Sequence, residues 1–132
     1  EHEGNRISRL FSYNHGEIPF VGKHIVLASG SYFSQGLIAT SERVYEPVFD
    51  LDVTYPEDRN QWYGRNAFDW QPYEGFGVKT GTDFRGMVHG QVLENLYVAG
   101  AVLEGFNPIK EGCGGGVSVL SALYVAEQIL SK

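Results

Sequence analysis

Three apolar runs stand out in the pattern of hydrophobic and polar positions along the chain. The run His24–Ala28 is continuous and stops at a Ser-Gly turn, which is typical of a parallel-sheet strand covered on both faces. A second run, Leu96–Ala99, ends at Gly100 in a similar way. The third, Val117–Leu130, is apolar around most of its circumference, which predicts a long helix buried between layers.

The segments between these runs are shorter and more polar. Residues 6–13 and 17–21 are expected to form two extended segments of a hairpin, joined by an Asn-His-Gly turn. Residues 44–53 favour strand structure, in which the carboxylates of Asp50 and Asp52 would both point to solvent. Between positions 62 and 76 the aromatic residues have no steady period, which predicts an irregular cap held by aromatic packing.

Composition and charge exclude several classes of function. A hydrophobic share of 42% is ample for a packed core, so disorder is not expected. The net charge of −6 and the absence of any Lys/Arg run argue against nucleic-acid binding, which depends on phosphate neutralisation. One cysteine cannot build an iron–sulfur cluster, and no His/Asp/Glu grouping has metal-ligand spacing, so no metal site is expected.

A glycine cluster opens the predicted long helix and carries the strongest chemical signal. Gly112, Gly114, Gly115 and Gly116 stand directly before Val117, where a helix presents unpaired N–H groups and a partial positive charge. The reduced ring of a flavin gathers negative charge that such an end would offset. A phosphate is the rival ligand, although the Lys-Ser/Thr of a nucleotide P-loop is absent, and tight helix packing without a ligand is the third possibility.

The single cysteine lies inside this cluster. At the start of a helix, Cys113 could be a reactive thiolate with a lowered pKa, or a small side chain that fills a tight loop.

Small residues also follow both apolar strands. Ala28, Ser29 and Gly30 end the first strand, and Gly100 and Ala101 end the second. Small side chains at the carboxyl end of a strand allow a cofactor or another backbone to approach closely. An ordinary exit from sheet to loop is the alternative.

The order of these strings resembles the C-terminal half of flavoproteins of the fumarate reductase and succinate dehydrogenase type. The strings are Ala28–Ser34, Gly105–Ile109 and Glu111–Gly116, with the aromatic segment between the first two. The resemblance implies an α/β fold: the C-terminal part of a Rossmann-like flavin-binding domain with an irregular β-rich insertion. It divides the chain into flavin-domain strands over 1–40, the insertion over 41–76, and a flavin-domain strand with the terminal helix over 77–132.

The same resemblance implies a cofactor, a substrate and partners. It is closest to family members that oxidise sn-glycerol 3-phosphate to dihydroxyacetone phosphate and send electrons to quinone through companion flavoprotein and iron–sulfur subunits. These work on the cytoplasmic side of the inner membrane, to which their partners attach them. FMN is the expected flavin, with FAD as the alternative. The expected flavin contacts are Ala28, Ser29, Gly30, Gly100, Ala101, Gly112, Gly114, Gly115, Gly116 and Val117.

Two departures from the family pattern affect this expectation. No Gly-x-Gly-x-x-Gly loop follows a strand, and Glu1–Asn5 resembles a turn inside a longer protein. We therefore expect a C-terminal fragment that is inactive alone, with the dinucleotide loop upstream. Ala101 stands where the family commonly carries an acidic residue that bonds the cofactor. A non-catalytic assembly or electron-relay subunit with a degenerate flavin site is thus the alternative function.

Three residues are candidates for substrate chemistry. His89 could accept the proton of a substrate hydroxyl, while Arg85 and Lys110 could hold a substrate phosphate. For Arg85 and Lys110 the alternative is an ordinary solvated surface charge.

Overall fold

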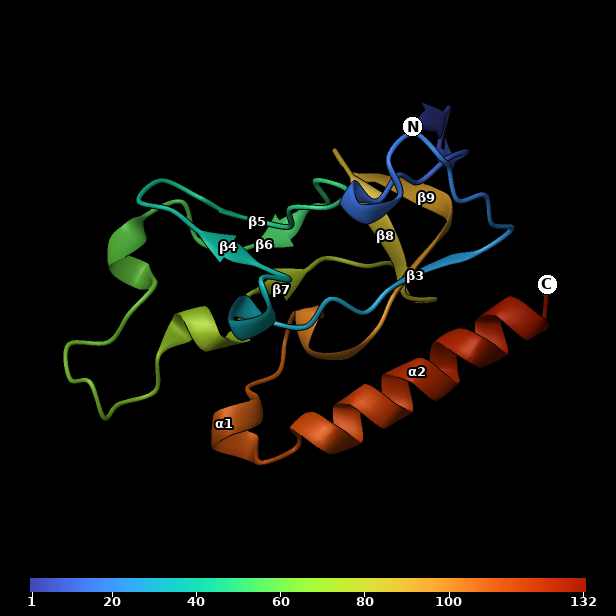
Figure 1. The fold of residues 1–132 in the computed structure, drawn as a ribbon. Helices are drawn as coiled ribbons and strands as arrows, with labels where there is room; N and C mark the ends of the chain where they lie inside the picture. The colour runs from blue at the N-terminus through green and yellow to red at the C-terminus, as the bar shows by residue number, and fades with distance from the viewer.

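A three-stranded sheet lies at the centre of the molecule (Figure 1). The computed structural model describes all 132 residues. Its strands are β1 (His2–Glu3), β2 (Arg6–Ile7), β3 (Ile25–Leu27), β4 (Ile38–Ala39), β5 (Val44–Tyr45), β6 (Val53–Thr54), β7 (Gly77–Val78), β8 (Arg85–Val88) and β9 (Gln91–Val98). Its helices are α1 (Pro108–Glu111) and α2 (Gly114–Leu130), with 3-10 turns η1 (Tyr13–His15), η2 (Tyr32–Ser34), η3 (Arg59–Gln61), η4 (Pro72–Gly75) and η5 (Gly100–Val102).

In the central sheet, β9 is the middle strand, with β3 parallel on one side and β8 antiparallel on the other. Ile25 pairs with Leu96, and Leu27 pairs with Val98. The apolar runs therefore predicted β3 and its parallel pairing, whereas β9 begins at Gln91, five residues before the predicted start, and ends at Val98. The predicted burial of β3 on both faces is wrong, because Leu27 is buried on one face while Val26, on the other, is 48% exposed.

The main core packs around this sheet and is tied to the N-terminal segment by one buried amide. The Asn95 side chain accepts a hydrogen bond from the Ile7 N–H and donates one to the Ile7 carbonyl, each at 2.9 Å. A buried amide needs such partners, because an unpaired one would lose its hydration without compensation. The core residues are Ile7, Leu27, Leu37, Leu51, Val78, Leu93, Leu96, Val98, Val102 and Leu103.

Helix α2 begins at Gly114, three residues before the predicted start, and it is not buried between layers. Only Ser121 and Val125 are buried, whereas Leu120 is 68% exposed and Leu123 is 58% exposed. Figure 1 shows the helix below the sheet, with one side free of any other element. The sequence prediction fails because one small sheet covers only one side of an all-round apolar helix.

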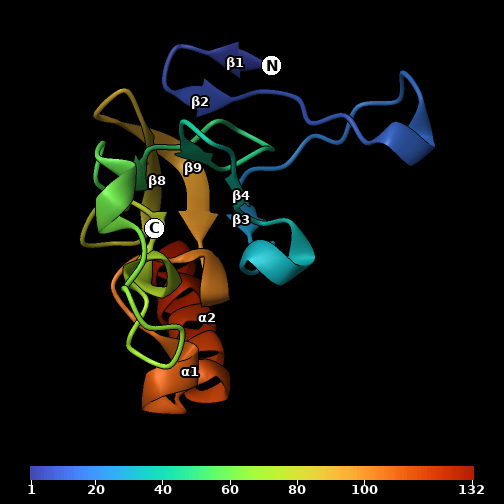
Figure 2. The same cartoon turned by 90° about the vertical axis from the view of Figure 1, so that its left-hand side faces the viewer.

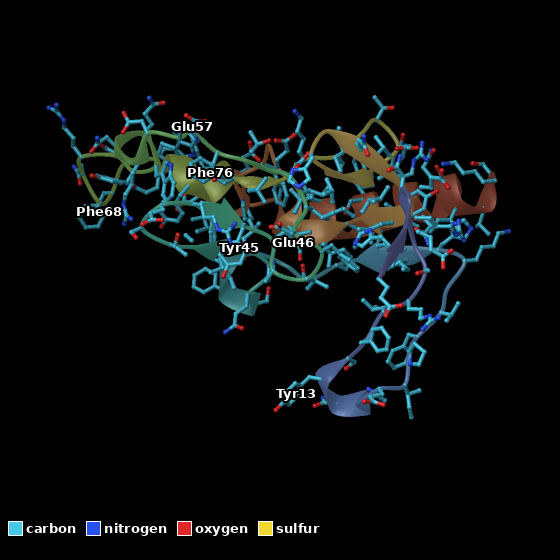
Figure 3. The ribbon with its side chains drawn as sticks, turned by 90° about the horizontal axis from the view of Figure 1, so that it is seen from above. Tyr13, Tyr45, Glu46, Glu57, Phe68 and Phe76 are labelled. Carbon is cyan, nitrogen blue, oxygen red and sulfur yellow. The ribbon has the colours of Figure 1, made fainter.

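The N-terminal segment forms the predicted hairpin, which projects from the body as an arm (Figure 2). Leu10 and Phe20 pair antiparallel, with backbone N–H to carbonyl distances of 2.9 and 2.7 Å. The turn η1 lies between them. Tyr13 is at the tip of the arm, far from the body of the molecule, and is fully exposed (Figure 3).

The aromatic segment is irregular, as predicted, and is stabilised by ring packing. Tyr55, Trp62 and Phe76 form a cluster in which the Trp62 ring meets the other two edge to face, at 5.7 and 6.2 Å. The Trp62 indole N–H donates to the Pro56 carbonyl at 2.6 Å. Strands β6 and β7 pair Val53 with Val78, joining this segment to the C-terminal part. The division into three segments stays a prediction.

The two carboxylates predicted to lie together in solvent are separated. Asp50 has a positive φ of 54°, and Asp52 lies in the chain just before β6, so they do not share one strand face. The Asp52 carboxylate accepts backbone N–H bonds from His89 at 2.8 Å and Gly90 at 2.7 Å. The Asp52 carboxylate was expected to point to solvent, but it binds a backbone N–H 37 residues away in the sequence.

The mixed α/β class is confirmed, whereas the Rossmann-like arrangement stays a prediction. The chain has four separate small sheets, of which three are two-stranded and antiparallel. Only the β3–β9 pair is parallel. No helix combines the length and apolar character that a membrane span requires.

Candidate functional site

The N-terminus of α2 presents backbone donors without partners. The first backbone hydrogen bond of the helix runs from the Val117 N–H to the Cys113 carbonyl at 2.9 Å, and no acceptor in the chain serves Gly114–Gly116. No side chain caps this end. A Cβ added at Gly115 or Gly116 would meet no atom within 4 Å, so the space beside these donors is open. The end of a 17-residue helix with free N–H groups is suited to a negatively charged or electron-rich group.

The end of β9 lies against the first turns of α2. Gly100 has a left-handed φ of 81°, and its N–H donates to the Ser121 hydroxyl at 2.9 Å. A Cβ at Gly100 would lie 3.9 Å from the Ser118 hydroxyl, which in turn donates to the Gly114 carbonyl at 2.9 Å. The structure therefore brings Gly100 next to Ser118 and Ser121 of the glycine-opened helix, and the flavin contacts expected of both segments stay a prediction.

The end of β3 makes a tight turn into η2. Gly30 has a φ of 79°, and a Cβ there would overlap the Ser34 hydroxyl. That hydroxyl donates to the Ser29 carbonyl at 2.7 Å. The Ser29 hydroxyl is itself buried and has no hydrogen-bond partner in the chain. Because β3 and β9 are parallel neighbours, this orphaned hydroxyl follows the strand end beside Gly100.

A capped single turn of helix precedes the glycine cluster. Asn107 is buried, and its side-chain oxygen accepts N–H bonds from Ile109 and Lys110 at 3.0 Å, which fixes the start of α1. Its amide nitrogen donates to the Glu74 carboxylate at 2.6 Å. Sequence reasoning missed Asn107, although Asn followed by Pro is a recognised signal for a helix start.

The three candidates for substrate chemistry are not brought together. Arg85 is paired with Asp83, with Nε and Oδ2 2.6 Å apart. His89 is exposed in the turn between β8 and β9, and Lys110 is exposed on α1 with its ammonium 5.6 Å from the centre of the Trp70 ring. His89 and Lys110 line different cavities. Their catalytic roles stay predictions.

The ion pair with Asp83 occupies the Arg85 guanidinium. Partial burial opposes ionisation of Asp83, but the hydrogen bonds and charge of Arg85, with the nearby Lys132, outweigh it and lower the pKa of the carboxyl. Arg85 is thus committed to an ion pair at the edge of the sheet.

The possible lowering of the Cys113 pKa is wrong. Partial desolvation raises the pKa of this thiol, and the hydrogen bond to the Glu111 carboxylate, at 3.4 Å, raises it further. Desolvation and the Glu111 carboxylate thus both favour the thiol over the thiolate.

Comparison with known proteins decides the family. A family model described as FAD binding domain matches residues 1–117, which include both strand ends and the whole glycine cluster. The chain belongs to the FAD-binding domain family. The expected resemblance to flavoproteins is therefore confirmed, and a flavin is the cofactor type that the family supports. The family is described by FAD, so the expectation of FMN over FAD gains no support.

Curated relatives carry a consistent name. The chain is 54% identical over 128 residues to a protein of Yersinia enterocolitica, and 52% identical over 128 residues to one of Yersinia pseudotuberculosis, both named as the B subunit of anaerobic glycerol-3-phosphate dehydrogenase. A protein of Aliivibrio fischeri with the same name is 44% identical over 134 residues. Each match covers at least 97% of this chain but only 30% of the relative. No solved structure matches.

The residues at the two strand ends and the helix start fit a flavin. Free N–H groups, open space beside Gly115 and Gly116, and the orphaned Ser29 hydroxyl are features that a bound, electron-rich ring system would use.

Proposed function

We propose that this chain is part of a flavin-dependent redox subunit that binds FAD against the N-terminus of α2 and the ends of β3 and β9. The observation that supports it most is the set of free N–H groups over Gly114–Gly116, with open space beside Gly115 and Gly116. The FAD-binding family match over residues 1–117 points to the same cofactor. When bound, the flavin supplies hydride-accepting chemistry.

The residues of this chain would hold and tune that cofactor. The N–H groups of Gly115 and Gly116 would face the part of the ring that gains negative charge on reduction, and the helix dipole would favour that charge by about 0.3–2 kcal/mol. The Ser29 hydroxyl would gain the partner that it lacks within the chain.

The relatives' name suggests the reaction. A glycerol-3-phosphate dehydrogenase of this kind would oxidise sn-glycerol 3-phosphate to dihydroxyacetone phosphate, with electrons passed through companion flavoprotein and iron–sulfur subunits to quinone. We place this activity on the cytoplasmic side of the inner membrane, in the assembled complex rather than in this chain alone. His89, Arg85 and Lys110 are not assigned to the substrate, because they lie apart.

A non-catalytic assembly or electron-relay subunit is the second candidate. Ala101 is the observation that favours it, because an alanine cannot supply the carboxylate that the resemblance led us to expect beside the cofactor. The visible absorption spectrum of the full-length gene product separates the two candidates. Flavin peaks that persist through gel filtration are expected for the redox subunit, whereas a folded, colourless protein that also fails to bind added FAD or FMN contradicts it.

Two glycine substitutions test the proposed location. Gly115→Ala puts a methyl group beside the free N–H groups, so we expect at least tenfold weaker FAD binding by calorimetric titration. The same change should raise the unfolding temperature, because alanine favours helix over glycine by about 1 kcal/mol. Gly75→Ala is the matched control, since Gly75 also has open space and no positive φ. Equal FAD affinities of the two variants would mean that the flavin binds elsewhere.

A further inference from the structure

A groove of about 850 Å³ opens beside the aromatic segment and extends to α1, where Pro108 adjoins the start of α2 at Gly114. Its walls come from η2, η3, η4, β4 and α1, which lie far apart in the sequence. A volume of this size lies within the range of small-molecule sites in proteins. No role assigned to the flavin site uses it.

Aromatic rings form much of the wall, and partners within the chain fix Tyr32, Trp62 and Tyr73, whereas Phe33 and Tyr63 are exposed. Tyr32 and Tyr73 pack edge to face with their centres 6.0 Å apart, and the Tyr32 hydroxyl donates to the Tyr73 carbonyl at 3.2 Å. The buried Trp62 is fixed by its bond to Pro56. Because the Tyr32 hydroxyl and the Trp62 N–H are engaged, these rings offer the groove apolar surface suited to stacking or edge contacts with another ring.

One cation on the wall has no acidic partner. The Arg59 guanidinium lies 5.6 Å from the centre of the Trp62 ring, and its single hydrogen bond, to the Thr40 carbonyl, is 3.4 Å long. No carboxylate lies within ion-pair distance of it. Glu74 also lines the groove and keeps its negative charge, and one of its oxygens accepts a hydrogen bond from the Asn107 amide, so the anionic group of a ligand belongs on the Arg59 side. Most of the five guanidinium donors therefore remain available beside an aromatic surface.

We propose that this groove binds a planar aromatic anion, such as an aromatic carboxylate, with the ring against Trp62 and Tyr73 and the anionic group on Arg59. Charge complementarity selects this class over a neutral apolar ligand, because an unpaired guanidinium gains a charge-assisted hydrogen bond only from an anion. The aromatic walls select it over a non-aromatic anion. The proposal does not depend on flavin binding.

Calorimetric titration with three probes tests both halves of the proposal. We expect 2-naphthoate to bind at least tenfold more tightly than neutral 2-naphthamide or non-aromatic cyclohexanecarboxylate. Arg59→Gln should weaken 2-naphthoate about tenfold and leave 2-naphthamide unchanged. Arg65→Gln is the control, because Arg65 is an exposed arginine nearby in sequence that does not line the groove.

The two tryptophans locate the bound probe. Only Trp62 lines the groove, so its indole N–H signal in a nitrogen–proton correlation spectrum should shift on addition of 2-naphthoate. The signal of Trp70, identified by its loss in Trp70→Phe, should stay in place. Equal binding of the carboxylate and the amide, equal losses in the Arg59 and Arg65 variants, or a shift of Trp70 alone would each overturn the proposal.

Discussion

The Ser121 hydroxyl accepts the N–H of Gly100 at 2.9 Å and donates to the Ser118 carbonyl at 3.2 Å, which connects α2 to the end of β9. Ser121 is one of only two buried residues on the helix. We expect Ser121→Ala to leave the Gly100 N–H without a partner and to lower the free energy of unfolding by about 1–3 kcal/mol. Urea denaturation followed by circular dichroism measures this loss.

Ser118→Ala is the matched control for this prediction. Ser118 is exposed and bonds only to a carbonyl of its own helix, so its loss should change stability by no more than about 0.5 kcal/mol. Equal effects of the two substitutions would mean that the bond to Gly100 does not hold α2 in place.

Glu46 is a fully buried carboxylate without a basic partner, and it organises the turn that follows β5. Its oxygens accept N–H bonds from Val48 at 2.6 Å, Phe49 at 2.8 Å and Leu51 at 3.4 Å. Glu46→Ala should lower the free energy of unfolding by about 2–3 kcal/mol, because several backbone donors lose their acceptor.

Two further variants define the cause of that loss. Glu46→Gln keeps one acceptor oxygen and should cost less, while the exposed Glu42→Ala should be nearly neutral. Thermal unfolding of the four proteins gives the comparison. A cost at Glu42 equal to that at Glu46 would contradict a structural role for the buried carboxylate.

How much the sequence predicts depends on whether the partner of a residue is local. The apolar runs at β3 and β9 and the glycine-opened start of α2 follow from short-range patterns, and they were predicted. The role of Asp52 and the bond between Asn107 and Glu74 were missed because the partners lie 37 and 33 residues away in the sequence. Glu46 was missed although its backbone partners are only two to five residues away, because its burial is set by the tertiary fold. The same limit applies to the site: spacing predicts the strand ends and the helix end, but not whether distant basic residues converge.

Tyr32 gives a prediction at alkaline pH. Burial raises the pKa of this phenol from 10.0 to about 12, with a further contribution from Tyr73. The folded state thus holds the proton more tightly than the unfolded state, so the stabilisation is complete below pH 10 and is lost as the pH rises toward 12. Denaturant unfolding at a series of alkaline pH values should show this loss in the native protein.

Tyr32→Phe should remove that part of the alkaline slope, and Tyr13→Phe should not, because Tyr13 is fully exposed at the tip of the arm. The absorbance of phenolate gives an independent measurement: one tyrosine should titrate late in the native protein and be absent in Tyr32→Phe. A late-titrating tyrosine that persists in Tyr32→Phe would assign the raised pKa to another residue.

Helix α2 offers the sharpest test of the structure against the sequence pattern. The pattern predicts burial all round, whereas the structure buries Val125 and exposes Leu120 and Leu123. Leu120→Gln and Leu123→Gln keep good helix formers and should each change the unfolding free energy by no more than about 0.5 kcal/mol. Val125→Ala should cost roughly 1–3 kcal/mol, because it empties a packed site. If the leucine substitutions in the 132-residue chain cost as much as the one at Val125, α2 is covered on both sides and its placement against the sheet is wrong.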